Sequence, residues 1–278
     1  MNVNETNTLG YHPGTTFVYR INATAKLLFF LIVSIACMTT FDTRFLGLVA
    51  ILSLVIFWWS RLKWRQVAFV VKFIAFFSIL NVLLVFVFSP QYGVHLYGTK
   101  TVLLSAGYFT VTTQELFYLV NVTLKYICTV PLALVFIMTT NPSLFASSLN
   151  RLGISYKISY AVALTLRYIP DVQREFGEIK DAQQARGIEL SSKGKLSTRL
   201  YGIINIIIPL ILASFENIDR ISTAMQLRRF GSKKKRTWYT AQPFRRMDAV
   251  VIGLAILLLV MTLVLFQVNH GRFYNPFQ

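Results

Sequence analysis

The chain has 278 residues, of which 55% are hydrophobic and 14% are charged. Soluble globular chains are about 45–50% apolar and about 25% charged, so this composition excludes an ordinary soluble enzyme and a disordered chain. The 28 Lys and Arg residues outnumber the 11 Asp and Glu residues, which gives a formal net charge of +17. In so apolar a chain, such an excess is typical of the cytoplasmic loops of a multispanning membrane protein rather than of a nucleic-acid-binding protein.

The first 24 residues are polar and contain His12-Pro13-Gly14. They lack the short apolar core of a secretory signal peptide. We therefore expect residues 1–24 to form a cytoplasmic N-terminal segment.

Five apolar runs follow, each close to the length that a helix needs to cross a bilayer. They lie near residues 25–40, 44–60, 67–89, 116–140 and 247–268. Only three residues separate the first two runs, which predicts a tight helical hairpin. Two further apolar runs, 154–170 and 202–215, are shorter, and the second contains Pro209. These two are predicted to graze the membrane rather than to span it.

The distribution of Lys and Arg predicts the orientation of the spans. Arg61, Lys63 and Arg65 place the link between the second and third spans in the cytoplasm, whereas residues 90–115 contain only Lys100 and are expected outside. Residues 140–246 contain 18 basic and 7 acidic residues, so they are expected in the cytoplasm. The tail beyond the last span then lies outside.

These expectations define an all-α integral membrane protein with about five transmembrane helices and a cytoplasmic helical coupling domain inserted before the last span. The predicted parts are a cytoplasmic segment 1–24, transmembrane helices 1–4 in 25–141, coupling helices in 142–246, and transmembrane helix 5 with a short outside tail in 247–278.

The coupling region has no glycine-rich nucleotide loop and no run of predicted strands. Its pattern predicts helices over 142–152, 155–186 and 195–229. A glycine directly follows the first two, and Gly231 lies just beyond the third. Two pairs four residues apart are expected to interact on helix surfaces, Arg174 with Glu178 and Glu216 with Arg220.

The second and third of these helices have similar ends. Residues 182–186 read Ala-Gln-Gln-Ala-Arg, and residues 224–228 read Ala-Met-Gln-Leu-Arg. Either end alone is most simply a helix stop, because cations favour helix C-termini. Two copies in one predicted cytoplasmic region favour docking to a partner, since arginine pairs with carboxylates and carbonyls and is a frequent interface hot spot.

Five short stretches carry a resemblance to a known family. They are Pro-Gly-Thr-Thr-Phe-Val-Tyr-Arg at 13–20, Thr-Thr-Asn-Pro at 139–142, Leu-Asn-Arg-Leu-Gly at 149–153, Leu-Arg-Tyr-Ile-Pro at 166–170 and Ala-Arg-Gly at 185–187. Over nearly its whole length, the chain resembles the transmembrane T component of energy-coupling factor (ECF) importers of vitamins and metal ions.

In that family the second signature is usually also Ala-Arg-Gly or a close variant. Here it reads Leu-Arg-Arg, which keeps the arginine but loses the alanine and the glycine. The ATPase-docking residues that the resemblance implies are Ala185, Arg186, Gly187, Leu227, Arg228 and Arg229.

The resemblance also implies partners and a mechanism. Two cytoplasmic ABC ATPases would dock on the coupling helices, and a separate membrane S component would bind the substrate. ATP with Mg²⁺ is expected on the partner ATPases, while this chain is expected to hold no cofactor, no metal and no catalytic residue. The implied location is the bacterial cell membrane, with the lipid bilayer around the spans and no nucleic-acid partner.

The alternative is a permease of an ordinary ABC importer, which lines the substrate path itself. Asp181-Ala182-Gln183 with Gly187 loosely resembles the coupling loop of such permeases, but the proline that should follow is displaced to Pro209. A membrane enzyme is disfavoured because His12, His95 and His270 lie in unrelated segments without metal-site or triad spacing.

Three other features have simpler readings. Residues 93–101 approach a Walker A loop, but Thr99 interrupts the required Gly-Lys-Ser/Thr order. The basic run 233–236 lies beside a span and is expected to fix topology and contact anionic lipids. Cys37 and Cys128 lie in apolar runs and indicate neither a disulfide framework nor a zinc site.

Lys125 falls inside the fourth apolar run, where a lysine is costly at membrane depth. One interpretation places it at the S-component interface as a functional intramembrane charge. The other lets its side chain snorkel to the outer surface. The sequence leaves both open.

Overall fold

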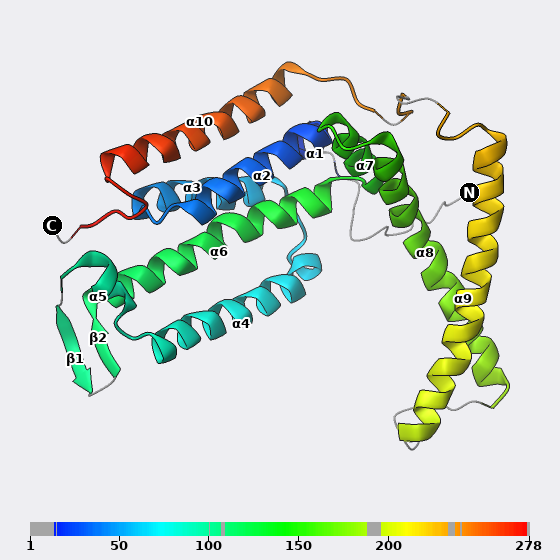
Figure 1. The fold of residues 1–278 in the computed structure, drawn as a ribbon, viewed down its shortest axis with the longest axis horizontal. Helices are drawn as coiled ribbons and strands as arrows, with labels where there is room; N and C mark the ends of the chain where they lie inside the picture. Colours follow the sequence, from blue (N-terminus) through cyan, green and yellow to red (C-terminus); the bar gives the residue numbers. More distant parts are fainter. Residues whose placement is uncertain are drawn as a thin grey trace. The chain divides into compact units, whose positions relative to one another are not determined.

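The computed structural model describes residues 14, 16–99, 101–106, 109–187, 196–232, 237–239 and 241–276. The chain divides into two units, shown in Figure 1. Among the described residues, the membrane bundle comprises those within 14–141 and 242–276, and the helical unit comprises those within 142–241. This division concerns packing alone, and the membrane side on which each unit lies stays a prediction.

The membrane bundle is built from long helices, one short hairpin and two short helical turns. Its elements are α1 (Phe17–Arg20), α2 (Ala23–Thr39), α3 (Thr43–Trp59), α4 (Trp64–Phe88), α5 (Tyr92–Tyr97), β1 (Val102–Ala106), β2 (Phe109–Thr112), α6 (Thr113–Thr139) and α10 (Arg246–Val268). In Figure 1, α2 and α3 lie between α10 and α6, and α4 lies on the other side of α6.

All five predicted spans are helices, with ends within a few residues of those expected. Three bundle helices, α4, α6 and α10, are long and apolar enough to cross a membrane. The two helices of the predicted hairpin, α2 and α3, have 17 residues each, which is at the lower limit for a span. The protein is thus an all-α integral membrane protein, apart from the small β-hairpin.

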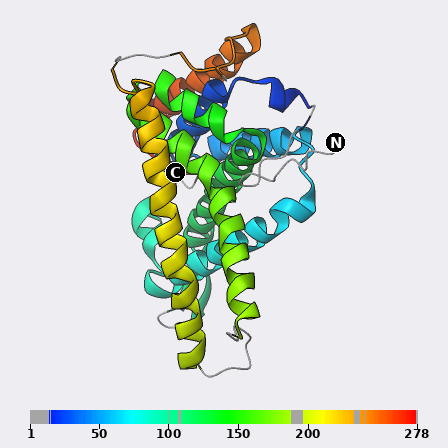
Figure 2. The same cartoon turned by 90° about the vertical axis from the view of Figure 1, so that its right-hand side faces the viewer.

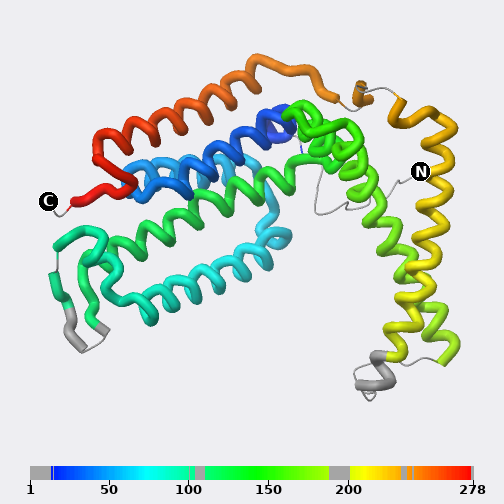
Figure 3. The backbone as a smooth tube through the Cα atoms, in the orientation of Figure 1, coloured from blue at the N-terminus to red at the C-terminus, as the bar shows by residue number. Residues whose placement is uncertain are grey.

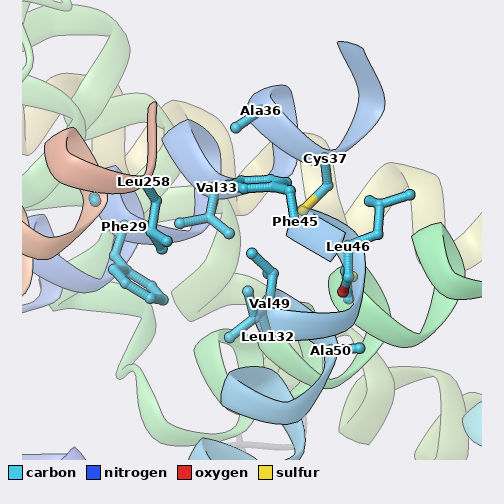
Figure 4. Close-up of a cluster of buried hydrophobic side chains, with 12 residues drawn as sticks. Phe29, Val33, Ala36, Cys37, Phe45, Leu46, Val49, Ala50, Leu132 and Leu258 are labelled. Carbon is cyan, nitrogen blue, oxygen red and sulfur yellow. The ribbon is translucent and has the colours of Figure 1, made fainter. Parts of the chain in front are cut away.

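The core of the bundle lies where α2, α3, α6 and α10 meet. Figure 4 shows Val33 of α2, Phe45 of α3 and Leu258 of α10 in one cluster, with Leu132 of α6 beside them. Val33 and Phe45 are fully buried. Because the other faces of these helices carry apolar side chains that remain exposed, the bundle is suited to a lipid surround rather than to water.

Polar caps fix the starts of the helices. The side-chain oxygen of Asn22 accepts a hydrogen bond from the Thr24 amide at 2.9 Å, and Asp42 accepts one from the Arg44 amide at 2.9 Å. Each cap satisfies an amide that the first turn of a helix leaves unpaired. The second cap closes the short turn expected between α2 and α3, but α2 packs mainly against α10 and α6, and α3 mainly against α6, rather than closely against each other.

The segment between α4 and α6 has more structure than the sequence analysis gave it. It contains α5 and an antiparallel hairpin in which Val102 pairs with Thr112. Gly98 ends α5 in the left-handed region at φ +70°. Residues 93–98 of the Walker-like stretch 93–101 are therefore part of a helix and its cap rather than of a phosphate loop. Lys100 of that stretch lies outside the described residues. The run Phe-Thr-Val-Thr explains β2, because such residues favour a pleated surface.

The helical unit contains α7 (Pro142–Arg151), α8 (Tyr156–Ala185) and α9 (Leu196–Leu227), and these three predicted helices are confirmed. Figure 2 shows α8 and α9 side by side. They are antiparallel: Gln183 near the end of α8 donates to the Asn205 carbonyl in the first half of α9 at 3.2 Å.

Two details of the helical unit differ from expectation. Pro170 and Pro209 lie inside continuous helices, so the prediction that 202–215 is too short to span is wrong. The segment Tyr201–Leu227 is long and apolar enough to cross a membrane by length and composition. An internal proline removes one hydrogen bond without ending a helix that packing supports.

The predicted ion pairs on these helices are half correct. Arg174 pairs with Asp171 at 3.2 Å rather than with Glu178, because a neighbour three residues away lies on the same face. The expected pair of Glu216 and Arg220 is present at 3.4 Å.

Candidate functional site

The end of α8 is a tight helical stop. The Arg186 amide donates to the carbonyls of Ala182 and Gln183, both at 3.2 Å. Gly187 follows in the left-handed region at φ +87°, and its amide donates to the Gln184 carbonyl at 3.0 Å. Ala185, Arg186 and Gly187 are all exposed.

The end of α9 repeats this geometry. The Arg228 amide donates to the Ala224 carbonyl at 3.2 Å, and the Arg229 amide donates to the Gln226 carbonyl at 2.9 Å. Each bond has its counterpart in α8 at the equivalent position. Leu227 is 81% exposed and lies next to the exposed Arg228, so the two helices present an arginine after the same turn.

Arg229 adopts the backbone conformation of the glycine that it replaces. Its φ is +52°, in the left-handed region where Gly187 also lies. A residue with a Cβ destabilises this conformation by about 1–2 kcal/mol. The loss of glycine from the second signature therefore leaves the turn intact, which the sequence alone did not predict.

The C-terminal ends of α8 and α9 lie at opposite ends of the antiparallel hairpin (Figure 3), and Arg186 and Arg228 directly follow them in the chain. Arg186 ends α8, whereas Arg228 lines a cavity together with Tyr156, the first residue of that helix. The 30 residues of α8 span about 45 Å at 1.5 Å per residue. The separation is large enough for two partners to dock without sharing a surface.

An aromatic cluster holds the Arg228 end in place. Phe230 packs against Tyr160 at 4.7 Å and against Tyr156 at 5.7 Å between ring centroids, and Trp238 lies 5.5 Å from Tyr156. The Trp238 indole also donates to the Asn150 side chain at 3.1 Å. The sequence analysis missed this cluster, although the spacing of Tyr156 and Tyr160 by four residues was a usable signal.

A polar cavity of about 400 Å³ opens beside this cluster. Arg167, from one of the stretches that carry the family resemblance, lines it together with Arg228 and Asp171. A second, mostly apolar cavity of about 470 Å³ lies farther along the groove between α8 and α9. The Arg228 end thus combines a positive rim with a hollow that an acidic partner segment could enter.

The structure gives Lys125 an internal role. Its side chain is buried, and its ammonium group donates to the Met38 carbonyl at 2.9 Å and lies 3.3 Å from the centre of the Phe41 ring. Met38 is in the last turn of α2, where carbonyls lack helical partners and a cation is favoured. The ammonium group thus ends on protein groups rather than in water, and a role for Lys125 at an S-component interface stays a prediction.

Within the bundle, a polar cluster binds both segments of the chain that lead to and from the helical unit. Lys26 donates to the carbonyl and hydroxyl of Thr139, where the chain leaves α6. The Asn22 side chain donates to the Gln242 carbonyl at 3.1 Å, and its amide donates to Asp248 of α10 at 2.8 Å. The first turn of α2 thus holds the outgoing and the returning segment.

Known proteins are similar to this chain over most of its length. The sequence model of the CbiQ family, described as cobalt transport protein, matches residues 14–239. The energy-coupling factor transporter transmembrane protein EcfT of Exiguobacterium sibiricum is 26% identical over 275 residues, which cover 95% of this chain and 99% of the relative. Proteins of the same name from Staphylococcus aureus and Streptococcus thermophilus are each 26% identical, over 90% and 93% of this chain and 95% and 97% of their own.

Proposed function

This chain belongs to the CbiQ family and is an EcfT-like transmembrane component of an ECF transporter, and from this premise we propose how it works. It couples two cytoplasmic ATPases, docked at Arg186 and Arg228, to a separate membrane S component that binds the substrate. ATP binding on the ATPases moves the helical unit, and the S component releases its substrate inward. The chain itself carries out no chemistry.

The observation that best supports two docking points is the repeated turn. Arg186 and Arg228 are exposed at helix ends that share two equivalent backbone hydrogen bonds, about 45 Å apart along the hairpin. A single small partner could not contact both. Arginine offers a planar set of five donors that matches a carboxylate or a set of backbone carbonyls, which suits a groove on an ATPase surface.

An apolar stripe on α9 supports a membrane partner for the helical unit. Its exposed residues recur at alternating intervals of four and three, which places them on one helix face. They are Ile204, Ile208, Ile211, Phe215 and Ile218. A stripe of this kind fits the apolar face of a membrane protein, and we assign it to the S component.

The substrate is a micronutrient, either a vitamin or a metal ion. The description of the family as cobalt transport proteins favours an ion, whereas the names of the EcfT relatives specify no substrate. In this mechanism the T component need not contact the substrate, so its own residues do not select between the two classes.

The alternative function, an ordinary ABC permease, requires a polar path through the bundle. In the described part of the bundle, the cavity between α3, α4 and α6 and the cavity beside α10 are lined almost entirely by apolar side chains. Such linings offer few groups that could replace the hydration of an ion. This favours the coupling function over the permease.

Co-purification of the ATPases and substrate uptake test the proposal. Replacing one hot-spot arginine by alanine costs about 2 kcal/mol at its interface, or about 30-fold in affinity. Because the other end still holds the complex, Arg186→Ala should retain the ATPases but transport poorly. The double variant with Arg228→Ala should lose both ATPases while still inserting in the membrane.

Matched controls are available on the same helices. Arg174→Ala on α8 and Arg220→Ala on α9 each remove an exposed arginine that pairs within its own helix, and both should retain the ATPases and uptake. Arg228→Ala should be milder than Arg186→Ala if the adjacent Arg229 takes over its contact, and adding Arg229→Ala should then expose the full effect. Retention of both ATPases and of normal uptake by the double variant would refute docking at the helix ends.

A further inference from the structure

A groove on the membrane bundle has the features of a lipid site. It lies between α3, α4 and α6, holds about 400 Å³ and is lined by apolar side chains such as Phe57, Ile74 and Val130. Trp64 and Ile79 of α4 both line it, so it extends about 22 Å along that helix at 1.5 Å per residue. This length exceeds the roughly 15 Å of one hydrocarbon leaflet, so an acyl chain fits along it.

The end of the groove at Trp64 has the composition of a membrane interface. Trp58, Trp59 and Trp64 are 77%, 56% and 60% exposed. Tryptophan side chains of this kind gather at the level of lipid headgroups, where the ring is half apolar and the indole N–H remains wet. The groove therefore begins at headgroup depth and continues into the hydrocarbon.

Three cations lie within three residues of Trp64, which lines this end of the groove. Arg61 lies in the link between α3 and α4, and Lys63 and Arg65 flank Trp64. All three are exposed, and their side chains have no acidic or hydrogen-bonding partner among the described residues. The sequence contains no Asp or Glu between residues 43 and 114, so no nearby carboxylate neutralises them.

The backbone adds to this positive field. α4 begins at Trp64 without a side-chain cap. The Gln66 amide donates to the Lys63 carbonyl at 2.9 Å, whereas the amides of Trp64 and Arg65 leave donors at the same end of the groove. A zwitterionic headgroup brings its own positive charge close to these cations, whereas an anionic one does not. The charge at this end of the groove thus selects among lipids, while the groove only requires an acyl chain.

We propose that the groove between α3, α4 and α6 binds one anionic phospholipid, with an acyl chain along α4 and its phosphate on Arg61, Lys63 and Arg65. The lipid fills a hollow beside α6, the helix that leads into the helical unit. This site requires only that the bundle lies in a membrane, so it does not rest on the docking of ATPases or of an S component.

Tryptophan fluorescence can report on this site directly. The chain has four tryptophans, and Trp238→Phe leaves only Trp58, Trp59 and Trp64, which lie at the end of α3 and the start of α4. Trp64 lines the groove, whereas Trp59 lines the cavity beside α10. The full chain is reconstituted in phosphatidylcholine vesicles that contain increasing fractions of brominated phosphatidylglycerol or, separately, brominated phosphatidylcholine. Half-maximal quenching should need at least about fivefold less phosphatidylglycerol, the factor for one cation at an anionic surface.

Charge variants test the headgroup contact. The triple variant Arg61→Gln, Lys63→Gln and Arg65→Gln should lose the preference for phosphatidylglycerol. A matched triple variant on the helical unit, Arg174→Gln, Lys180→Gln and Arg220→Gln, removes the same charge and should keep it. Equal quenching by the two brominated lipids in the Trp238→Phe protein, or an unchanged preference in the first triple variant, overturns the proposal.

Filling the groove tests the acyl chain. Ala75 lines the groove, and Ala68 on the same helix does not, so Ala75→Phe should weaken quenching by phosphatidylglycerol while Ala68→Phe should not. Equal quenching of these two variants excludes an acyl chain in the groove. If binding of another membrane subunit of the complex abolishes quenching by both lipids, the groove is a protein interface and the proposal is wrong.

Discussion

The ammonium group of Lys26 donates to the carbonyl and to the hydroxyl of Thr139, at 3.0 Å each. These residues are 113 positions apart and both are buried. Thr139 ends α6, immediately before the chain enters the helical unit. Because Asn22, four residues before Lys26, holds the returning chain at Gln242, one turn of α2 fixes both connections within the bundle.

Lys26→Met should therefore destabilise the bundle and reduce coupling. The variant loses hydrogen bonds from a charged group, which contribute about 1.5–3 kcal/mol, and it removes the cation that interacts with the buried Asp248. Thermal unfolding in detergent should show a lower midpoint. In the assembled transporter, we expect less substrate moved per ATP hydrolysed while the ATPases stay bound.

The control for this prediction is Lys72→Met. Lys72 is exposed on α4 and has no partner among the described residues, so its loss should leave the unfolding midpoint unchanged. Equal unfolding midpoints for Lys26→Met and Lys72→Met would show that the hydrogen bonds of Lys26 to Thr139 do not stabilise the packing of α2 against the end of α6.

Gly187→Arg should give α8 the ending that α9 already has. A Cβ at Gly187 meets nothing within 4 Å, so the cost comes only from its left-handed backbone, about 1–2 kcal/mol. Thermal unfolding should detect this loss, and the ATPases should still co-purify, because the turn at Arg229 is formed without glycine.

Gly177→Arg serves as the matched control, since it lies inside α8 and also has open space around its Cβ position. Arginine is a better helix former than glycine, so this change should stabilise the helix slightly. Loss of the ATPases from Gly187→Arg alone would mean that the first end requires glycine for docking.

Gly93→Ala should destabilise the packing of α5 against α6. A Cβ at this position would lie 2.6 Å from the Gln114 carbonyl oxygen, and the Gly93 amide donates to the buried Glu115 carboxylate at 2.7 Å. Separating the two helices to relieve this clash should cost about 1–3 kcal/mol. The measurement is thermal unfolding of the purified chain.

Gly47→Ala in α3 is the comparison, because nothing lies within 4 Å of its Cβ position. Replacing a mid-helix glycine by alanine stabilises by roughly 0.5–1 kcal/mol, so the two variants should shift the midpoint in opposite directions. A midpoint that rises for both would contradict the close approach of α5 and α6.

Cysteine labelling tests the predicted orientation. Cys37 and Cys128 are fully buried, so the wild-type chain should not react with a membrane-impermeant thiol reagent. Leu103→Cys, at an exposed position of the β-hairpin, should be labelled on intact cells. Arg174→Cys, exposed on α8, should react only after the membrane is opened, and the reverse pattern would overturn the charge-based topology.

The sequence alone determined the five spans and the three coupling helices of this protein, but not the short helices α1 and α5. The five apolar runs and the three coupling helices were predicted because hydrophobic length, charge and glycine stops are local patterns. The positions of Arg186 and Arg228 at helix ends were also predicted from the sequence, because a helix end and its cation are adjacent in sequence. The β-hairpin before α6 was missed, because its weak alternation was read as part of a loop.

Only the tertiary structure decided which polar groups meet. Lys26 and Thr139 are 113 residues apart, and Asn22 and Asp248 are 226 apart, so no window of sequence joins them. Lys125 looked like an unpaired charge in its span until the fold brought the Met38 carbonyl, 87 residues away, to its ammonium group. A buried charge requires a partner, but the identity of that partner depends on how the helices pack, and packing joins residues from distant parts of the chain.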